Sequence, residues 1–454
     1  MSDRFMLLLG AFGLLLVILM QGAKLNKDSK KHKLRKLKVD RKDKAHGIIF
    51  GLQSHNKVMY SPFAGEEHCL VCAGTGKGKT SSILIPTLRS WQGTSFSIDI
   101  SGDISKNCPD MPNKIVFDPE DSNTIPYDVF ASIDCIRDTS KQEESLVQLA
   151  YLLIPEPPNI SANAKYFSDG GRKILAGALI YGYYSGIDFC QICRGIVAHN
   201  WLCLFSEILN GDIEKAKMYL NSFVDANDQN TAGCYQQASD AVQLFATSAD
   251  VCNAVHRPQI GERALTPKDI ESCNVFVVVQ DEKLELYAPL LNIIVSQFMQ
   301  YISCRGIKDK SKSAKILVTL DEFASLGISK ETILSALRKY RKKYTRIMIL
   351  TQSVADINLM YGQDCTRALL SNFAFKVLLG GLGDVESLEY FAKLIGYKKT
   401  TKRSISHSSR DTSRTESEEK EYIIEPADLD RMGDKAILIS EEGHFILDKN
   451  FYYK

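Results

Sequence analysis

Hydrophobic and polar positions fall into blocks along the chain that predict different structural elements. FMLLLGAFGLLLVILM (5–20) is an uncharged apolar run. CLVC (69–72), ILVTL (316–320) and IMILTQS (347–353) are short runs rich in apolar and β-branched residues, as expected of strands buried on both faces of a parallel sheet. By contrast, the run 402–421 is rich in Ser and Thr and has no apolar period, so we predict a mobile surface loop there.

The order of the strand and helix patterns indicates the fold class. The two patterns alternate over 47–129 and again over 270–400, which is typical of an α/β protein with a parallel sheet. Between them, 139–254 holds several helical segments, with Pro-rich punctuation at IPEPPN. We therefore predict one sheet domain, 47–129 and 256–454, interrupted by an all-α domain at 130–255.

The apolar run near the start of the chain, extended to residue 23, is long enough for a membrane-spanning helix. Residues 24–45 hold eleven Lys and Arg against three Asp, and this excess predicts that they lie in the cytoplasm. A cleaved signal peptide is the alternative, but no A-x-A-like site follows the run. We predict a single-pass anchor at 5–23 and a basic juxtamembrane linker at 24–46, with the body in the cytoplasm.

The net charge of +2 is distributed unevenly along the chain. Because the basic stretch carries about eight net positive charges, the rest of the chain is acidic by about six charges and shows no overall electrostatic footprint for nucleic acid. We interpret the basic stretch as topogenic charge on anionic lipid in preference to a DNA-binding arm.

Twelve cysteines are scattered without a disulfide-like framework, which favours a reducing compartment. The pairs Cys69/Cys72 and Cys190/Cys193 have the C-x-x-C spacing of zinc sites. Since the first pair lies in a predicted strand and the second in a helical pattern, we expect thiols that pack in the core.

Residues 73–80, AGTGKGKT, fit the Walker A pattern of a phosphate-binding loop. Its glycines let backbone N–H groups turn inward around phosphate, Lys79 reaches the outer phosphates and the Thr80 hydroxyl can hold Mg²⁺. A strand before the loop and a helix after it supply the required context, whereas a flexible Gly-rich surface loop is the alternative. The predicted nucleotide-binding residues are Gly74, Thr75, Gly76, Lys77, Gly78, Lys79, Thr80 and Ser81.

A second acidic element follows the predicted strand ILVTL. Asp321 at the end of this strand can hold Mg²⁺, and Glu322 can orient and polarise an attacking water. Paired acids after a strand are often only a helix cap, but beside a Walker A loop they favour a Walker B motif with a catalytic Glu. Gln352, at the end of the next predicted strand, would lie near the γ-phosphate and sense its presence.

The helix between these two strands is crowded with basic side chains. A solvated basic face is one interpretation, and an arginine finger that reaches a neighbouring subunit's nucleotide is the other. The basic residues are Arg338, Lys339, Arg341, Lys342, Lys343 and Arg346.

Taken together, these motifs resemble the coupling-protein ATPases of type IV secretion and conjugation (TraG/TraD-like), within the RecA-like hexameric pumps. The resemblance rests on the Walker A loop, LDEFASLG (320–327), ILTQS (349–353), the run 369–396 and EPADLDRMGDKAILIS (425–440). It implies a RecA-like P-loop NTPase domain with the all-α domain inserted and an N-terminal transmembrane helix.

The resemblance also implies roles for individual residues. Lys79 and Thr80 would be phosphate and Mg²⁺ ligands, Asp321 the Walker B acid and Glu322 the catalytic base. The family's finger lies about eleven residues before the Gln, which selects Arg341 over Arg338 and adds it to Glu322 and Gln352 as a catalytic residue. The segment Asp99–Asp103 departs from the family pattern because it lacks a Lys, and only one membrane helix is visible where relatives often show two.

The leading functional hypothesis is therefore an ATPase that uses ATP and Mg²⁺, assembles as a homo-hexamer and is anchored in the bacterial inner membrane. It would hand a relaxase–DNA complex, an effector protein or both to a type IV secretion channel. A DNA pump of the chromosome-partition or packaging type and an ATP-binding cargo receptor that does not translocate its cargo are the alternatives. The sequence leaves the choice between DNA and protein cargo open.

Overall fold

The computed structural model describes residues 36–156, 160–307, 313–408 and 411–454. The predicted anchor at 5–23 and most of the predicted linker lie outside these residues. Within the described ranges, no helix combines the length and apolar character that crossing a membrane requires.

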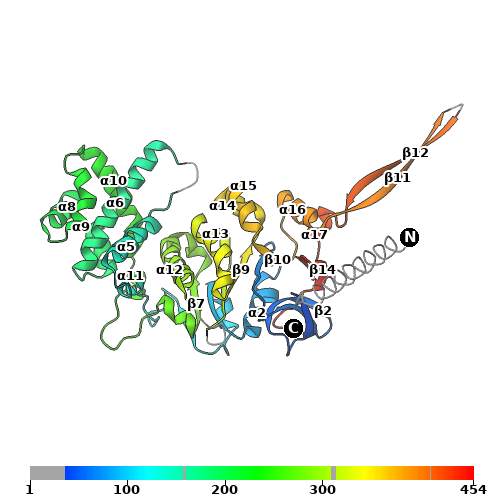
Figure 1. Ribbon diagram of the computed structural model, residues 1–454, viewed down its shortest axis with the longest axis horizontal. Coiled ribbons are helices and arrows are strands. Elements are labelled where there is room, and N and C mark those ends of the chain that lie inside the picture. Colours follow the sequence, from blue (N-terminus) through cyan, green and yellow to red (C-terminus); the bar gives the residue numbers. More distant parts are fainter. Residues whose placement is uncertain (1–35, 157–159, 308–312, 409–410) are drawn as a thin grey trace, which may run out of the picture.

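A sheet of twelve strands runs through the centre of the part of the chain that the structure describes (Figure 1). Its order is β1-β3-β2-β14-β13-β10-β4-β9-β8-β5-β7-β6. The seven strands from β10 to β6 run parallel to one another. The other five strands form an antiparallel extension, joined through β13 to β10. The strands are β1 (Lys38–Arg41), β2 (Gly47–Ser54), β3 (Lys57–Pro62), β4 (His68–Cys72), β5 (Thr94–Ile100), β6 (Lys114–Phe117), β7 (Asn274–Val279), β8 (Ile316–Leu320), β9 (Thr345–Thr351), β10 (Phe373–Leu378), β13 (Lys435–Ser440) and β14 (Gly443–Asp448).

The central strands are buried over their whole length, as their sequences predict. Successive side chains of a strand point to opposite faces, and in β4 Leu70 and Cys72 join one hydrophobic core while Cys69 and Val71 join another on the other face. Helices cover both faces, and Phe298 from one of them stacks on Phe96 of β5 with 4.2 Å between ring centroids. These helices are α2 (Ile85–Ser90), α3 (Asp103–Lys106), α12 (Leu284–Cys304), α13 (Lys330–Lys339), α14 (Val354–Tyr361), α15 (Gln363–Leu370), α16 (Val385–Ile395) and α17 (Pro426–Asp430).

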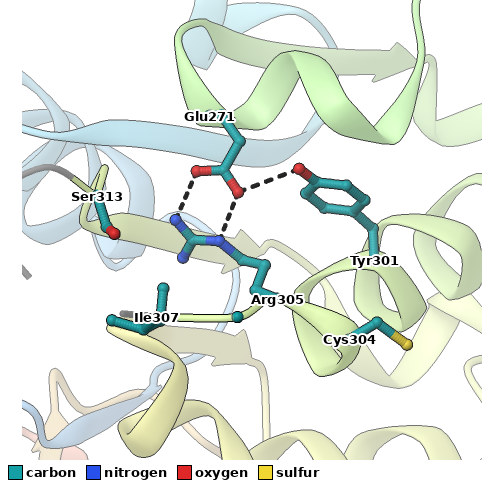
Figure 2. A pocket seen from close by; sticks show the side chains of 7 residues that line it. Glu271, Tyr301, Cys304, Arg305, Ile307 and Ser313 are labelled. Atoms are coloured by element: carbon teal, nitrogen blue, oxygen red, sulfur yellow. Dashed lines mark hydrogen bonds and ion pairs between the residues drawn. The ribbon is translucent and has the colours of Figure 1, made fainter. Parts of the chain in front are cut away.

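One buried ion pair fixes the end of α12 to the sheet (Figure 2). Arg305 donates from Nε and Nη2 to the two carboxylate oxygens of Glu271, at 2.6 Å each, and from Nη1 to the Lys343 carbonyl. Tyr301 donates to the same carboxylate. Arg305 Nη2 also donates to the Ala314 carbonyl at 3.0 Å, so the segments that lead into β8 and β9 are both held by the end of α12.

Helices make up the insertion between β6 and β7, which lies at one end of the molecule in Figure 1. At the start of six of these helices, a polar side chain accepts a hydrogen bond from a backbone N–H group of the first turn, as is typical of helix caps. The capping residues are Asp138, Ser161, Asp188, Asn200, Asn227 and Ser248. At the centre, Gly170 lets α6 approach α10 closely, because a Cβ there would lie 2.2 Å from Cys234 Sγ. The helices are α4 (Ala131–Asp134), α5 (Thr139–Leu153), α6 (Ala162–Tyr184), α7 (Phe189–Ala198), α8 (Trp201–Asn210), α9 (Glu214–Leu220), α10 (Asp228–Thr247) and α11 (Ala249–Ala254).

The structure differs from the sequence prediction at two segments. The end of the segment expected as a linker forms β1, which pairs with β3. The prediction of a mobile surface loop at 402–421 is wrong in its secondary structure, because β11 (Tyr397–Ser408) and β12 (Asp411–Tyr422) form a long antiparallel pair that projects from the body (Figure 1). At the base of this pair of strands, the rings of Tyr397 and Tyr422 stack. Lys398 and Lys399 pair with Glu421 and Glu418 across the strands, and such pairs of opposite charge stabilise neighbouring strands.

Candidate nucleotide site

The Walker A loop joins β4 to η1 (Lys79–Leu84), a π-helical turn that continues into α2. Gly76 and Gly78 have φ angles of +71° and +93°, a region that side chains with a Cβ rarely adopt. Gly74 is packed against the loop that follows β10, since a Cβ there would lie 1.7 Å from the Gly381 carbonyl oxygen. The loop is therefore held in one shape from outside as well as by its own glycines.

Three adjacent parallel strands bring the predicted chemical groups together. β9 lies between β4, which leads into the Walker A loop, and β8, which leads into Asp321 and Glu322. Because the carboxyl ends of parallel strands share one edge of the sheet, Gln352 after β9 lies between the loop and the acids. Glu322 has φ +44°, a left-handed conformation at the turn that follows the strand.

Lys79 lies at the centre of the site and is almost fully buried. Its Nζ atom lies 3.1 Å from the Ala73 carbonyl oxygen and 3.1 Å from Glu322 Oε1. The Lys79 side chain is 7% exposed and the Glu322 side chain 23% exposed, so the carboxylate remains reachable from solvent while the ammonium does not. The buried positive charge is thus balanced by the acid expected to act as base.

Gln352 joins both sides of the site through its amide. Its Nε2 donates to Glu322 Oε2 at 3.2 Å, and its Oε1 accepts from Thr75 Oγ1 at 3.2 Å.

Asp321 is buried beside the hydroxyl that was predicted to share Mg²⁺ with it. Thr80 Oγ1 donates to Asp321 Oδ2 at 3.3 Å, and the Glu322 backbone N–H donates to Asp321 Oδ1 at 3.1 Å. Burial, reinforced by the negative charge of Glu322, raises the pKa of Asp321 to about 6. A buried carboxylate that shares a hydroxyl with a neighbouring Thr suits a divalent cation.

Arg341 is the one predicted catalytic residue that the fold does not bring to this edge. It precedes β9, whereas Gln352 follows it, and seven strand residues separate the two ends by about 20 Å. Its Nη2 donates to the Asn372 carbonyl at 2.8 Å.

The charge of Arg341 also acts on His68 at the start of β4. Burial, and after it the nearby Arg341 charge, lower the pKa of His68 to about 3.

The other sequence candidates have structural roles. Asp99 is buried at the end of β5, and its carboxylate accepts hydrogen bonds from the backbone N–H groups of Ile104 and Ser105, so it holds the turn into α3. Cys69 and Cys72 are buried in β4, and burial raises the pKa of Cys69 to about 12. Among the described residues, no group of three or more His, Cys, Asp and Glu side chains is arranged to hold a metal ion.

Sequence reasoning missed two segments that touch the Walker A loop. One is the loop after β10, whose glycines at 380, 381 and 383 all have positive φ angles and whose Gly380 carbonyl accepts from the Gly74 N–H group. The other is the segment 449–454, whose Phe451 ring lies near Gly78. The cluster of glycines directly after a buried strand could have indicated the loop after β10. We find no pattern in the sequence that indicates the contact made by the segment 449–454.

The fold and the site define an α/β P-loop nucleotide-binding protein. A family model described as type IV secretory system conjugative DNA transfer matches residues 19–454, and the chain belongs to this family. The expected resemblance to type IV secretion coupling proteins is thus confirmed.

Individual relatives agree with this assignment. Protein VirD4 of Rhizobium rhizogenes is 24% identical over 86% of this chain and 59% of its own length, and the conjugal transfer protein TraG of Rhizobium radiobacter is 23% identical over 83% and 60%. This chain thus spans about three fifths of the length of these relatives.

Solved structures show the same fold. The unbound bacterial conjugative coupling protein TrwB superimposes with a TM-score of 0.67 at 18% identity, covering 91% of this chain and 93% of TrwB. TrwB in complex with a non-hydrolysable ATP analogue gives a TM-score of 0.65 at 17% identity, covering 85% of this chain and 86% of TrwB. A further TrwB structure contains ADP and Mg²⁺.

Proposed function

We propose that the chain is an ATPase that recruits a substrate and couples it to a type IV secretion channel. One observation carries the ATPase part, namely that Lys79, Glu322, Gln352 and Thr75 form one connected polar network at the ends of three adjacent strands. An ATP-binding receptor would need the Walker A loop alone, whereas this network also positions a carboxylate to take a proton from water.

The residues present fit MgATP. The Walker A loop supplies backbone N–H groups and the Lys79 ammonium for phosphate, and Thr80 and Asp321 would hold Mg²⁺, which neutralises charge on the phosphate oxygens when bound. Lys79 then exchanges its pairing with Glu322 for phosphate oxygens. Glu322, released from the ammonium but still held by Gln352, is free to accept the proton of the attacking water.

The chain would act as a homo-hexamer, with each site completed by Arg341 of the next subunit. A positive charge from an arginine finger, supplied by the same chain or by a neighbour, stabilises the charge that develops in phosphoryl transfer. Arg341 is half-buried and donates to the Asn372 carbonyl, so it would exchange that hydrogen bond for the neighbour's phosphate.

Mixing inactive subunits tests this sharing. Lys79→Ala and Arg341→Ala subunits should partly restore each other's ATPase activity, since mixed rings contain complete sites. Lys79→Ala mixed with Glu322→Gln is the matched control, because both defects lie in the half-site of the chain that binds the nucleotide and no complete site can form. Equal activity in the two mixtures would remove Arg341 from the site.

We further propose that the anchor at 5–23 holds the hexamer in the bacterial inner membrane and that the cargo is a relaxase–DNA complex, an effector protein or both. The support is the family assignment together with relatives named as a type IV secretion system coupling protein and as conjugal transfer proteins. ATPase activity of the full-length chain in detergent, measured with no DNA, single-stranded DNA and double-stranded DNA at two salt concentrations, tests the DNA arm. Stimulation that falls with salt supports DNA cargo, and hydrolysis indifferent to DNA leaves protein cargo as the proposal.

A further inference from the structure

The segment 449–454 lies along the helical stretch that follows the Walker A loop, from η1 to the last turn of α2. The Tyr452 backbone N–H donates to the Ser81 carbonyl at 3.0 Å, and the Arg89 guanidinium lies 4.9 Å from the centroid of the Tyr452 ring. A Cβ on Gly78 would lie 3.1 Å from a carbon of the Phe451 ring. These contacts fix the segment directly beside the phosphate loop.

The aromatic side chains of this segment are not all used in packing. The rings of Phe451 and Tyr453 are stacked, with 5.4 Å between centroids and 28° between planes. Phe451 is half-buried, whereas Tyr453 is 62% exposed. Lys454 lies over the Phe451 ring with its Nζ 4.5 Å from the centroid. Tyr452 anchors the segment and packs edge-on against Tyr453, with 5.1 Å between ring centroids. Tyr453, stacked on Phe451, is the ring that is exposed to solvent.

The sheet order places these two stacked rings on the side where a nucleoside would leave the loop. The groups expected to act on the outer phosphates come from β9 and β8, on one side of β4. Phe451 and Tyr453 follow β14, which lies on the other side of β4, beyond β10 and β13. A nucleotide with its outer phosphates at Lys79 and Glu322 therefore has its base directed away from those acids, toward the aromatic rings.

We propose that Tyr453, supported by the Phe451 ring on which it stacks, forms the nucleobase-stacking surface of the site. This inference rests on the proposed function, because it assumes that a nucleoside triphosphate occupies the loop. Aromatic rings bind the flat face of a base, and every base has such a face. The surface therefore accepts the purine of ATP and that of GTP, and it contributes affinity for the nucleoside and not for the phosphates.

Calorimetric titration of the full-length chain in detergent separates these contributions. The ligands are MgATP, MgGTP and magnesium tripolyphosphate, which carries the phosphates without a base. The variants are Tyr453→Ala, whose exposed ring can be removed without opening the core, and Phe451→Leu, which keeps an apolar side chain against Gly78. Tyr166→Ala is the matched control, since this tyrosine is 50% exposed on α6 in the helical insertion.

Loss of base stacking should weaken MgATP and MgGTP binding by about 5- to 30-fold in Tyr453→Ala, the lower part of the range for base–aromatic contacts. Phe451→Leu should weaken both in the same direction, because it removes the ring on which Tyr453 stacks. Tripolyphosphate binding should stay within about twofold of the unchanged chain, and Tyr166→Ala should match the unchanged chain for all three ligands. Unchanged MgATP affinity in both variants would overturn the inference, as would an equal loss for tripolyphosphate, because the segment would then only shape the loop. Failure of the unchanged chain to bind MgATP would instead contradict the proposed function itself.

Discussion

Asp321→Asn should make the nucleotide-free protein more stable at neutral pH, although it removes a residue assigned to the site. The carboxyl of Asp321 is buried with Glu322 close by, and both effects raise its pKa to about 6 from an ordinary value of 3.8. Folding therefore favours the protonated form of this group. The free energy of unfolding is lowered by the buried charge when Asp321 is ionised, and this cost is absent in Asn.

The size of the effect follows from linkage. A difference of about two pKa units corresponds to about 3 kcal/mol, since each unit is about 1.4 kcal/mol. Below pH 4 the carboxyl is protonated in both the folded and the unfolded chain, and the cost is absent. It grows as pH rises from 4 to 6 and is fully present above pH 6. Because Asn loses part of the hydrogen bonding with Thr80 and the Glu322 backbone, about 3 kcal/mol is an upper value.

Thermal unfolding of both proteins between pH 4.5 and 8, without nucleotide or Mg²⁺, measures this difference. For a chain of this length about 3 kcal/mol corresponds to a rise in Tm of about 3 °C, expected in full at pH 7.5 and at about a third of that size at pH 4.5. Addition of MgATP should reverse the order at pH 7.5, because the metal then compensates the carboxylate only in the unchanged protein. The measured quantity is the Tm of Asp321→Asn minus the Tm of the unchanged protein. A difference at pH 7.5 that is no larger than the difference at pH 4.5 would refute the reasoning.

Two further predictions concern packing at the site and at the sheet. Gly74→Ala should destabilise the protein by about 1–3 kcal/mol and weaken nucleotide binding, because its Cβ meets the Gly381 carbonyl; thermal unfolding and calorimetry check this. Gly195→Ala is the control: it lies in α7, its Cβ meets no atom within 4 Å, and it should stabilise by up to about 1 kcal/mol without changing nucleotide binding. Arg305→Lys should lower the free energy of unfolding in urea by about 2–3 kcal/mol, since it breaks the bidentate pair with Glu271 and leaves buried carbonyls without donors; a change below about 0.5 kcal/mol would contradict this account of Figure 2.

The positions of the Walker A loop, Asp321 and Gln352 at one edge of the sheet could be predicted because each depends on a local pattern in the sequence. The Walker A loop, Asp321 and Gln352 each follow a buried apolar strand, and parallel strands place their carboxyl ends at one edge of the sheet. The α/β fold class follows from the same alternation. To predict where these residues lie, it is enough to recognise the strand, the turn that follows it and the type of residue at that turn.

What the sequence did not predict depends on contacts between distant segments. The contact of Gly74 with Gly381 and the position of Phe451 beside Gly78 join residues about 300 or more positions apart, and no local period records them. The antiparallel pair of β11 and β12 was missed because the sequence of its strands has no apolar period. Cross-strand pairs such as Lys399 with Glu418 become visible only when the register is known.

The most direct test of the central claim compares ATP binding with ATP hydrolysis in Glu322→Gln. Without the carboxylate, Lys79 loses its internal counter-charge, so the variant should bind MgATP as tightly as the unchanged chain or more tightly. Hydrolysis should fall by about 100-fold or more, the contribution of a positioned general base. Hydrolysis above about a tenth of the unchanged rate, with binding intact, would contradict the assignment of Glu322 as the base and with it the proposed mechanism.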